Sequence, residues 1–319
     1  MGKRLLITGG TGFLGRRLGK AFREDGYEVM LTGRNLDQNR AAMEFSGCNV
    51  LASDVANIES VRDVFAEFLP EIVVHAAASK YVDTAEANPM ECVDVNVLGS
   101  QNVARVSIAY QVKTVVGVST DKAAPPVSNT YGLTKALMER VYCAMDAKTE
   151  TNFVCVRFGN MPWSTGSVFP IWTRMSSNGG VIESTGSNMT RLFTLADEAV
   201  KLIRTSIDHI SEVRGDVLCR TMKAGLIRDF LDVWTKRKGG SWVPVNPRPG
   251  ERDYEHLIGE AELPYTSEIV LDGVKHYLIT PNRVVEHPIA EIISSINAER
   301  FNEEEIWGII GVPPSDIVI

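Results

Sequence analysis

The sequence predicts an α/β fold, in which a doubly wound parallel sheet carries a smaller C-terminal lobe. In the N-terminal half, short apolar runs alternate with segments of helical periodicity, the pattern typical of a parallel sheet with helices on both faces. A glycine-rich turn joins the first apolar run to the first helical segment. With 319 residues, 44% of them hydrophobic, the chain is long enough to bury one large core and a smaller second one.

The first predicted strand, Arg4 to Thr8, runs into a glycine-rich turn that is followed by a helix to about Phe22. Its glycines at 9, 12 and 15 allow a tight turn, close backbone approach to a pyrophosphate, and close packing of helix on strand. The helix N-terminus attracts phosphate. The turn therefore predicts a Rossmann-type dinucleotide site, with an ordinary glycine-rich turn as the alternative. The residues assigned to it are Gly9, Thr11, Gly12, Phe13, Leu14 and Gly15.

The second predicted strand, Glu28 to Thr32, leads to Arg34. An arginine at this point suits a ribose 2′-phosphate, so Arg34 favours NADP, although Asp37 keeps NAD open and Arg34 could be a solvated loop residue. A third strand, Asn49 to Ala52, delivers Asp54 and Val55 to the adenine edge of the cofactor.

After a helix over 58–68, a fourth strand, Ile72 to Val74, runs into His75 and three alanines. The small side chains of Ala76, Ala77 and Ala78 allow the backbone to lie against the cofactor, whereas a histidine that ends a buried strand is more often a structural group.

The next predicted helix covers Pro89 to Ala109 and turns Asn96 toward the core, where we assign it to the cofactor pocket. This helix and the one near residues 131–148 are apolar on more than one side, so each needs a second partner surface. They predict a homodimer or a higher homo-oligomer.

The fifth strand, Thr114 to Val118, is followed by Thr120, Asp121 and Lys122. The C-terminal ends of strands are where open parallel sheets place their chemistry. The triplet offers a hydroxyl, an acid and a base, which is more than the oxidation of an alcohol requires.

A helix from Tyr131 to about Met145 follows this loop. Residues four apart on a helix are neighbours, so the Lys135 ammonium is expected near the Tyr131 hydroxyl, where it would lower a pKa that is ordinarily about 10. Such a tyrosine can exchange protons with a substrate alcohol. The predicted catalytic residues are Thr120, Asp121, Lys122, Tyr131 and Lys135.

The sixth strand, Asn152 to Phe158, ends the regular alternation. We therefore place a cofactor-binding domain at residues 1–160 and a substrate lobe at 161–319, with some segments of the lobe returning to the core. Arginines suit bidentate contacts with phosphates, so Arg191 and Arg248 are candidates for a substrate diphosphate, with ordinary salt bridges as the alternative.

The composition excludes other classes of protein. The net charge is −7 and no basic run occurs, which argues against binding to nucleic acid. Five scattered cysteines have neither paired nor metal-ligand spacing, so we expect reduced, mostly buried thiols and no metal site. A first strand near the N-terminus and the absence of a run of 18 apolar residues indicate a cytoplasmic protein that is not membrane-bound.

Several motifs together carry a resemblance to a known family. They are His75-Ala-Ala-Ala78, Asn88-Pro-Met-Glu-Cys92, Ser119-Thr-Asp-Lys-Ala-Ala124, Arg157-Phe-Gly-Asn160, Gly166-Ser-Val-Phe-Pro170, Met189-Thr-Arg191 and Arg248-Pro-Gly-Glu251. With them the chain resembles an extended short-chain dehydrogenase/reductase. Within that superfamily it is similar to the inverting UDP-N-acetylglucosamine 4,6-dehydratases of polysaccharide biosynthesis. The resemblance implies a substrate pocket of Lys80, Asn160, Ser167, Val168, Thr190, Arg191, Arg248 and Glu251.

The resemblance also implies a mechanism with tightly bound NADP. Tyr131, assisted by Thr120 and Lys135, would take the C4 hydroxyl proton, Lys122 the C5 proton, and Asp121 would protonate the departing C6 hydroxyl. A nucleotide-sugar epimerase or 4-ketoreductase remains an alternative, as does a non-enzymatic NADP-sensing or scaffold protein, although such sensors often lack the tyrosine or lysine that this chain has.

The chain departs from the family pattern in three places. One extra residue lies between the Asp121-Lys122 pair and the helix tyrosine, in a loop that contains Pro125-Pro126. After the alanine run the family tends to have Lys-His, where this chain has Lys80-Tyr81. After the Gly159-Asn160 pair the family has small residues, where this chain has Met161-Pro162-Trp163. We expect these changes to lie at the substrate pocket.

Overall fold

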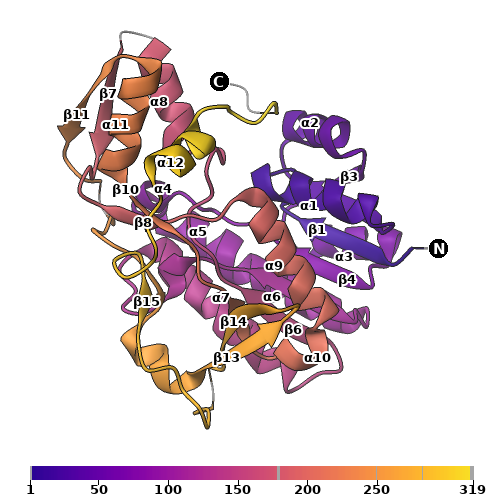
Figure 1. Ribbon diagram of the computed structural model, residues 1–319. Coiled ribbons are helices and arrows are strands. Elements are labelled where there is room, and N and C mark those ends of the chain that lie inside the picture. The colour runs from indigo at the N-terminus through magenta and orange to yellow at the C-terminus, as the bar shows by residue number, and fades with distance from the viewer. Residues whose placement is uncertain (1, 178–179, 249, 282, 317–319) are drawn as a thin grey trace.

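A nine-stranded sheet forms the centre of the computed structural model, which describes residues 2–177, 180–248, 250–281 and 283–316 (Figure 1). The strand order is β13-β14-β9-β6-β5-β4-β1-β2-β3. The strands of this sheet are β1 (Arg4–Thr8), β2 (Glu28–Gly33), β3 (Asn49–Ala52), β4 (Ile72–His75), β5 (Thr114–Val118), β6 (Asn152–Val156), β9 (Val217–Cys219), β13 (Thr266–Leu271) and β14 (Val274–Ile279).

The strands from β9 to β3 are parallel, and β14 pairs antiparallel with both β9 and β13. The chain begins at β1 and winds outward first to β3 and then, from β4, in the opposite direction. The sheet therefore reverses its winding between β1 and β4, where Thr8 pairs with His75. In doubly wound folds this switch point opens a crevice at the carboxyl ends of the strands. The predicted fold class is confirmed.

Helices cover both faces of the sheet. Successive strand residues point to opposite sides, so both faces carry apolar side chains that the helices bury. Leu5 and Ile7 of β1 join the core cluster formed with α1, α2 and α9, whereas Leu6 joins the cluster formed with α3, α6 and α7. The helices around the sheet are α1 (Phe13–Glu24), α2 (Leu36–Ser46), α3 (Ile58–Phe68), α4 (Val82–Ala87), α5 (Pro89–Val93), α6 (Gly99–Ala109), α7 (Thr130–Asp146), α9 (Ala196–Asp208) and α10 (Ile210–Val213).

The predicted helix over 89–109 contains a π-helical turn, η1 (Asp94–Leu98), between α5 and α6. The backbone N–H of Gly99 reaches the carbonyl of Asp94, five residues back, and this wider turn contains the fully buried Asn96. Such turns often mark functional positions. Strand β6 ends at Val156, short of the predicted Phe158.

A separate lobe holds a third, aromatic-rich core cluster beyond the ends of the parallel strands (Figure 1). It combines helices with short pairs of strands, β8 with β10 and β7 with β11. Its elements are α8 (Val168–Ser177), β7 (Val181–Thr185), β8 (Thr190–Leu192), β10 (Ala224–Leu226), α11 (Ile227–Lys238), β11 (Ser241–Val245) and α12 (Glu303–Ile310). The remaining elements are two 3₁₀ turns, η2 (Asp121–Ala123) and η3 (Glu260–Tyr265), and a strand pair, β12 (His256–Ile258) with β15 (Ile293–Ser294).

All five cysteines are buried and none forms a disulfide, as their scattered spacing predicts. Within the described ranges, every helix is too short or too polar to cross a membrane.

Candidate functional site

The glycine turn lies at the switch point between β1 and β4. Gly9 has φ +65°, and a Cβ there would lie 2.6 Å from the Cα of Ala77, so only glycine fits. A Cβ at Gly15 would lie 2.4 Å from the Gly9 carbonyl oxygen, which allows helix α1 to sit close to the turn. At Gly12 a Cβ would meet only that oxygen, at 3.3 Å, and no side chain caps α1. The turn therefore fits a pyrophosphate held by backbone N–H groups.

The other residues of the turn contact neighbouring elements. Thr11 packs against Gly33 at the end of β2. A Cβ added to Gly33 would lie 2.1 Å from the Thr11 hydroxyl oxygen. Phe13 is buried in the aromatic cluster of the lobe, whereas Leu14 packs on the sheet core. These contacts link the turn to both β2 and the lobe.

Arg34 and Asp54 face each other at the carboxyl ends of β2 and β3. The Arg34 Nη1 atom lies 3.9 Å from Asp54 Oδ2, and the side chains are 56% and 42% exposed. An exposed arginine of this kind is accessible to a phosphate. The Val55 side chain is instead buried against Gly99, so only its backbone is placed to meet a ligand.

Asn96 organises the loop after the alanine run rather than presenting a free amide. Its Oδ1 accepts from the Ser79 N–H at 2.7 Å, and its Nδ2 donates to the Ser79 carbonyl at 3.0 Å and to Thr134 Oγ1 at 2.9 Å. Ala76, Ala77 and Ala78 are thereby held beside the glycine turn.

His75 is the structural group that its position at the end of a buried strand predicts. Its Nδ1 bonds with Thr8 Oγ1 at 2.7 Å and its Nε2 with Ser100 Oγ at 3.0 Å. Complete burial lowers the pKa of His75 to about 3, so the ring is neutral.

Thr120, Asp121 and Lys122 lie directly after β5, where η2 begins. The Thr120 hydroxyl donates to Asp121 Oδ1 at 2.9 Å. Asp121 is fully buried, and its Oδ2 has no hydrogen-bond partner within the described chain. Gly132 allows helix α7 to approach, since a Cβ there would lie 2.2 Å from the Lys122 carbonyl oxygen. Tyr131 is thus brought to the triplet.

The predicted lowering of the Tyr131 pKa is wrong, and Lys135 is not among the groups that shift it. Burial raises the pKa of Tyr131, the negative charge of Asp121 raises it further, and a hydrogen bond with Thr120 opposes the rise. The Lys135 ammonium donates to Met138 Sδ at 3.1 Å, and burial lowers its pKa to about 8. Because no positive charge offsets the burial of Tyr131 and the nearby Asp121, its phenol is protonated at neutral pH. It needs an added positive charge nearby before it can take a proton.

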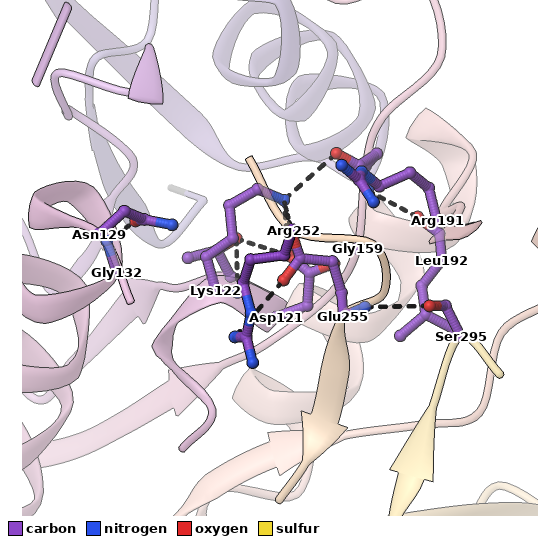
Figure 2. Close-up of polar contacts among 12 residues, drawn as sticks. Asp121, Lys122, Asn129, Gly132, Gly159, Arg191, Leu192, Arg252, Glu255 and Ser295 are labelled. Carbon is purple, nitrogen blue, oxygen red and sulfur yellow. Dashed lines mark hydrogen bonds and ion pairs between the residues drawn. The ribbon is translucent and has the colours of Figure 1, made fainter. Parts of the chain in front are cut away.

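Lys122 contacts two acidic groups that are distant from each other in the sequence, Asp121 and Glu255 (Figure 2). Its Nζ is 3.1 Å from Asp121 Oδ1, 3.3 Å from Asn160 Oδ1 and 3.7 Å from Glu255 Oε1. Burial by itself lowers the pKa of Lys122, but the Asp121 and Glu255 carboxylates outweigh this effect and raise it, with Arg191 opposing them. In this structure Lys122 is therefore an ammonium.

Glu255 and Arg252 are site residues that the sequence analysis missed. Arg252 Nη1 lies 3.9 Å from Glu255 Oε2, and the side chains are only 15% and 3% exposed. The available signal was weak: a glutamate that follows the Arg248-Pro-Gly-Glu251 turn and directly precedes the apolar strand β12. Charged residues are rarely fully buried unless they are paired, so such a placement indicates a functional cluster.

Among the predicted substrate residues, Asn160 and Arg191 lie beside Lys122. Asn160 Nδ2 donates to the Leu192 carbonyl at 3.1 Å, which leaves its Oδ1 toward the lysine. The Arg191 guanidinium donates to the Thr190 carbonyl at 3.0 Å and extends toward the cluster (Figure 2). The Thr190 hydroxyl bonds with Ser295 Oγ at 2.8 Å, so it has a structural partner.

Lys80, Ser167 and Val168 meet at the loop before α8. Lys80 Nζ donates to the Thr165 carbonyl at 2.7 Å, and loss of hydration lowers the pKa of this amine to about 8. The Ser167 hydroxyl is buried without a hydrogen-bond partner in the described ranges, and Val168 begins α8.

The turn with Arg248 and Glu251 packs on α4 and is held by polar contacts. Arg248 Nη1 lies 3.5 Å from Asp83 Oδ2, and its backbone N–H donates to Glu251 Oε2 at 2.8 Å. Glu251 Oε1 accepts from Thr185 Oγ1 at 3.1 Å. Pro249 of the same motif lies outside the described residues. No contact brings Arg248 to Lys122 in the described chain, so its assignment to a diphosphate stays a prediction.

Trp163 is buried in the lobe. It is 3% exposed, and its Nε1 donates to the Ile309 carbonyl of α12 at 2.7 Å. Its ring lies 5.7 Å from the Phe169 ring, between centroids. Trp163 therefore packs in the core of the lobe, and the expectation that the Met161-Pro162-Trp163 departure lies at the substrate pocket stays a prediction. By contrast, Tyr81 does contact the loop before α8, since its hydroxyl lies 3.4 Å from the Thr165 carbonyl oxygen.

Cavity size does not identify the site. A cavity of about 1880 Å³ is lined by Arg17, Trp163, Arg220 and residues 283–293, among others, but by none of the predicted catalytic residues. We place the site at Lys122 because two buried carboxylates converge there at the carboxyl ends of the strands, each with one oxygen that lacks a hydrogen-bond partner among the described residues.

Comparison with known proteins identifies the family of this chain. Residues 5–270 match the family described as "Polysaccharide biosynthesis protein". An "uncharacterized membrane protein" of Methanocaldococcus jannaschii, MJ1061, is 31% identical over 97% of this chain and 95% of its own length. A UDP-glucose 4-epimerase of Rickettsia conorii is 30% identical over 95% of this chain and 94% of its own length.

A solved structure, that of Pen from Bacillus thuringiensis, superposes with a TM-score of 0.87 at 27% identity and covers 97% of both chains. With a matching family pattern over most of its length, the chain belongs to the polysaccharide biosynthesis protein family of extended short-chain dehydrogenases/reductases.

Proposed function

We propose that this protein is an NADP-dependent nucleotide-sugar 4,6-dehydratase that acts on UDP-N-acetylglucosamine or a related UDP-sugar. Its product would be a 4-keto-6-deoxy sugar nucleotide. The observation that carries the proposal is the position of Asp121 and Lys122 against Tyr131. Oxidation at C4 requires one proton acceptor, whereas loss of water from C5 and C6 requires a further base and a further acid.

Tyr131, Lys122 and Asp121 are each assigned a separate proton transfer. A bound nicotinamide cofactor would supply hydride acceptance at C4, return of that hydride to C6, and, in its oxidised form, a positive charge that favours the phenolate. Tyr131, with Thr120 at its hydroxyl, would then take the C4 hydroxyl proton. Lys122 would remove the C5 proton, which a C4 ketone makes acidic, and Asp121 in its protonated form would donate to the departing C6 hydroxyl.

An epimerase or 4-ketoreductase of the same superfamily is the second candidate, favoured by the UDP-glucose 4-epimerase at 30% identity. It would leave Asp121 and Lys122 without a proton-transfer role. The deciding experiment is to incubate the protein and NADP with UDP-, GDP-, CDP- and dTDP-sugars and to weigh the products by mass spectrometry. Loss of 18 Da, the mass of one water, supports the dehydratase, and an unchanged mass with an inverted C4 centre supports the epimerase.

Arg34 is expected to select NADP over NAD. A 2′-phosphate that faces the exposed guanidinium would form charge-assisted hydrogen bonds worth about 1.5–3 kcal/mol, or roughly a tenfold or greater preference. Arg34→Ala should remove this preference when both dissociation constants are measured by titration. Arg62→Ala, an exposed arginine on α3, is the control. An unchanged NADP/NAD ratio in Arg34→Ala would exclude Arg34 from the site.

We also propose a dimer formed through α5 to α7, because apolar side chains remain exposed there. Met90 is 80% exposed, Leu133 58% and Leu137 47%. A paired isologous interface would cover them. Light scattering at micromolar concentration should give twice the monomer mass, and Leu133→Glu with Leu137→Glu should give the monomer. Met43→Glu, an exposed methionine on α2, should leave the mass unchanged. A monomeric wild-type protein would refute the dimer.

A further inference from the structure

Glu255 has an unusual environment for a carboxylate. Its side chain is 3% exposed, its Oε1 lies 3.7 Å from the Lys122 ammonium, and its Oε2 has no hydrogen-bond partner in the described part of the chain. Its backbone N–H donates to Ser295 Oγ at 3.0 Å, which fixes the residue just before β12. Most buried polar atoms are hydrogen-bonded, so an exception of this kind needs a functional or structural reason.

Asp121 repeats the pattern as a second carboxylate at Lys122. Its Oδ1 accepts from the ammonium, and its Oδ2 is buried without a hydrogen-bond partner in the same described ranges. The lysine thus meets two buried carboxylates that are distant from each other in the sequence (Figure 2). Among the residues that the structure describes, Arg191 and Arg252 are the other charged groups that face this cluster, and the Tyr131 phenol faces Asp121.

The two carboxylates cannot have the same task in an elimination. Asp121 has to carry a proton for the departing C6 hydroxyl, so it cannot also receive one. Lys122 is an ammonium in this structure, and an ammonium cannot remove the C5 proton. Its own proton must therefore first move to another group, and Glu255 is the only other carboxylate that the described contacts place beside its Nζ.

We propose that Glu255 is a positioning residue for the elimination, one that holds Lys122 in place and accepts a proton from it so that Lys122 reaches C5 as a neutral amine. This inference rests on the proposed dehydratase function. The N–H bond of the ammonium breaks and an O–H bond forms on Glu255. Lys122 then takes the C5 proton, the C6–O bond breaks, and Asp121 supplies the proton that completes the water. After the hydride taken from C4 has been returned to C6, Lys122 returns its proton to C5, Glu255 returns its own to Lys122, and the proton taken from the C4 hydroxyl restores Asp121.

The electrostatic surroundings of Glu255 agree with this role. Burial raises its pKa, and Asp121 raises it further, while Lys122, Arg191 and Arg252 oppose the rise. A carboxyl group whose pKa lies above its ordinary value is better suited to hold a proton briefly than a solvated glutamate is.

The test compares Glu255→Gln with the wild-type enzyme in two separate readouts. The absorbance of reduced cofactor should appear at the wild-type rate on mixing with substrate, because C4 oxidation depends on Tyr131, and it should persist longer, because hydride returns to C6 only after water is lost. Water loss should slow by about a hundredfold, the range typical of a lost proton-transfer group. Its rate should also rise with pH toward the pKa of Lys122, since the lysine must now lose its proton to solvent, whereas the wild-type rate should be flat near neutral pH.

Glu255→Asp should retain the flat pH profile at a reduced rate, and Glu260→Gln, an exposed glutamate on η3, should behave as wild type. Should Glu255→Gln not fold, Glu255→Asp decides, because a wild-type rate of water loss in that variant would overturn the inference. If the wild-type enzyme removes water and Glu255→Gln does so at the same rate and with the same pH profile, this inference alone is overturned. A wild-type enzyme that removes no water would overturn the proposed function and, with it, the role of Glu255.

Discussion

Lys122→Ala and Asp121→Asn are each expected to slow water loss by about a hundredfold or more, the usual range for a general base or acid. Both should leave C4 oxidation in place, because Tyr131 carries that proton transfer. Mass spectrometry of the product follows water loss, and stopped-flow absorbance of reduced cofactor follows oxidation. In wild type, solvent deuterium should enter C5 of the product, since Lys122 exchanges the proton that it returns.

Tyr131→Phe is the matched comparison, because it should abolish the transient reduced-cofactor signal itself. It removes one oxygen atom from the same site while Asp121 and Lys122 keep their mutual contact of 3.1 Å. A Lys122→Ala enzyme that turns over near the wild-type rate, or a product that keeps its C6 hydroxyl, would refute the dehydratase reading in favour of the epimerase or reductase.

Arg157→Met is expected to destabilise the fold by about 3–5 kcal/mol, the typical cost of removing one partner from a buried ion pair. Arg157 is 1% exposed and joins Glu139 of α7, at 2.6 Å, to Glu262 of η3, at 2.9 Å. It also donates to the Leu257 carbonyl at 2.8 Å. Methionine fills similar volume but leaves two carboxylates without their counter-charge. Chemical denaturation would measure the loss in the free energy of unfolding.

Arg62→Met, which breaks an exposed ion pair on α3, is the control and should cost no more than about 1 kcal/mol. Adding Glu139→Gln to Arg157→Met should recover part of the loss, because one uncompensated charge is then removed. Equal stability of Arg157→Met and wild type would show that the buried pairs contribute nothing net.

Local sequence determined the fold class of this protein and part of its candidate site. Alternating apolar runs and helical periodicity suffice to predict the parallel sheet, because each strand or helix depends on neighbouring residues. Gly9, Gly12 and Gly15 are equally local, since the turn needs their missing side chains. Thr120, Asp121 and Lys122 are adjacent in the chain, so the end of a single strand delivers all three to the site.

Only the tertiary structure decided the electrostatics. Tyr131 and Lys135 are neighbours on one helix, yet burial and the charge of Asp121 raise the pKa of the phenol, and neither effect can be read from helical spacing. The ion pairs of Glu255 and Arg157 are formed with partners far away in the sequence, so local sequence does not indicate their roles. A side chain's charge state depends on the solvent it loses and on the charges it meets, and both are set only when distant segments pack together.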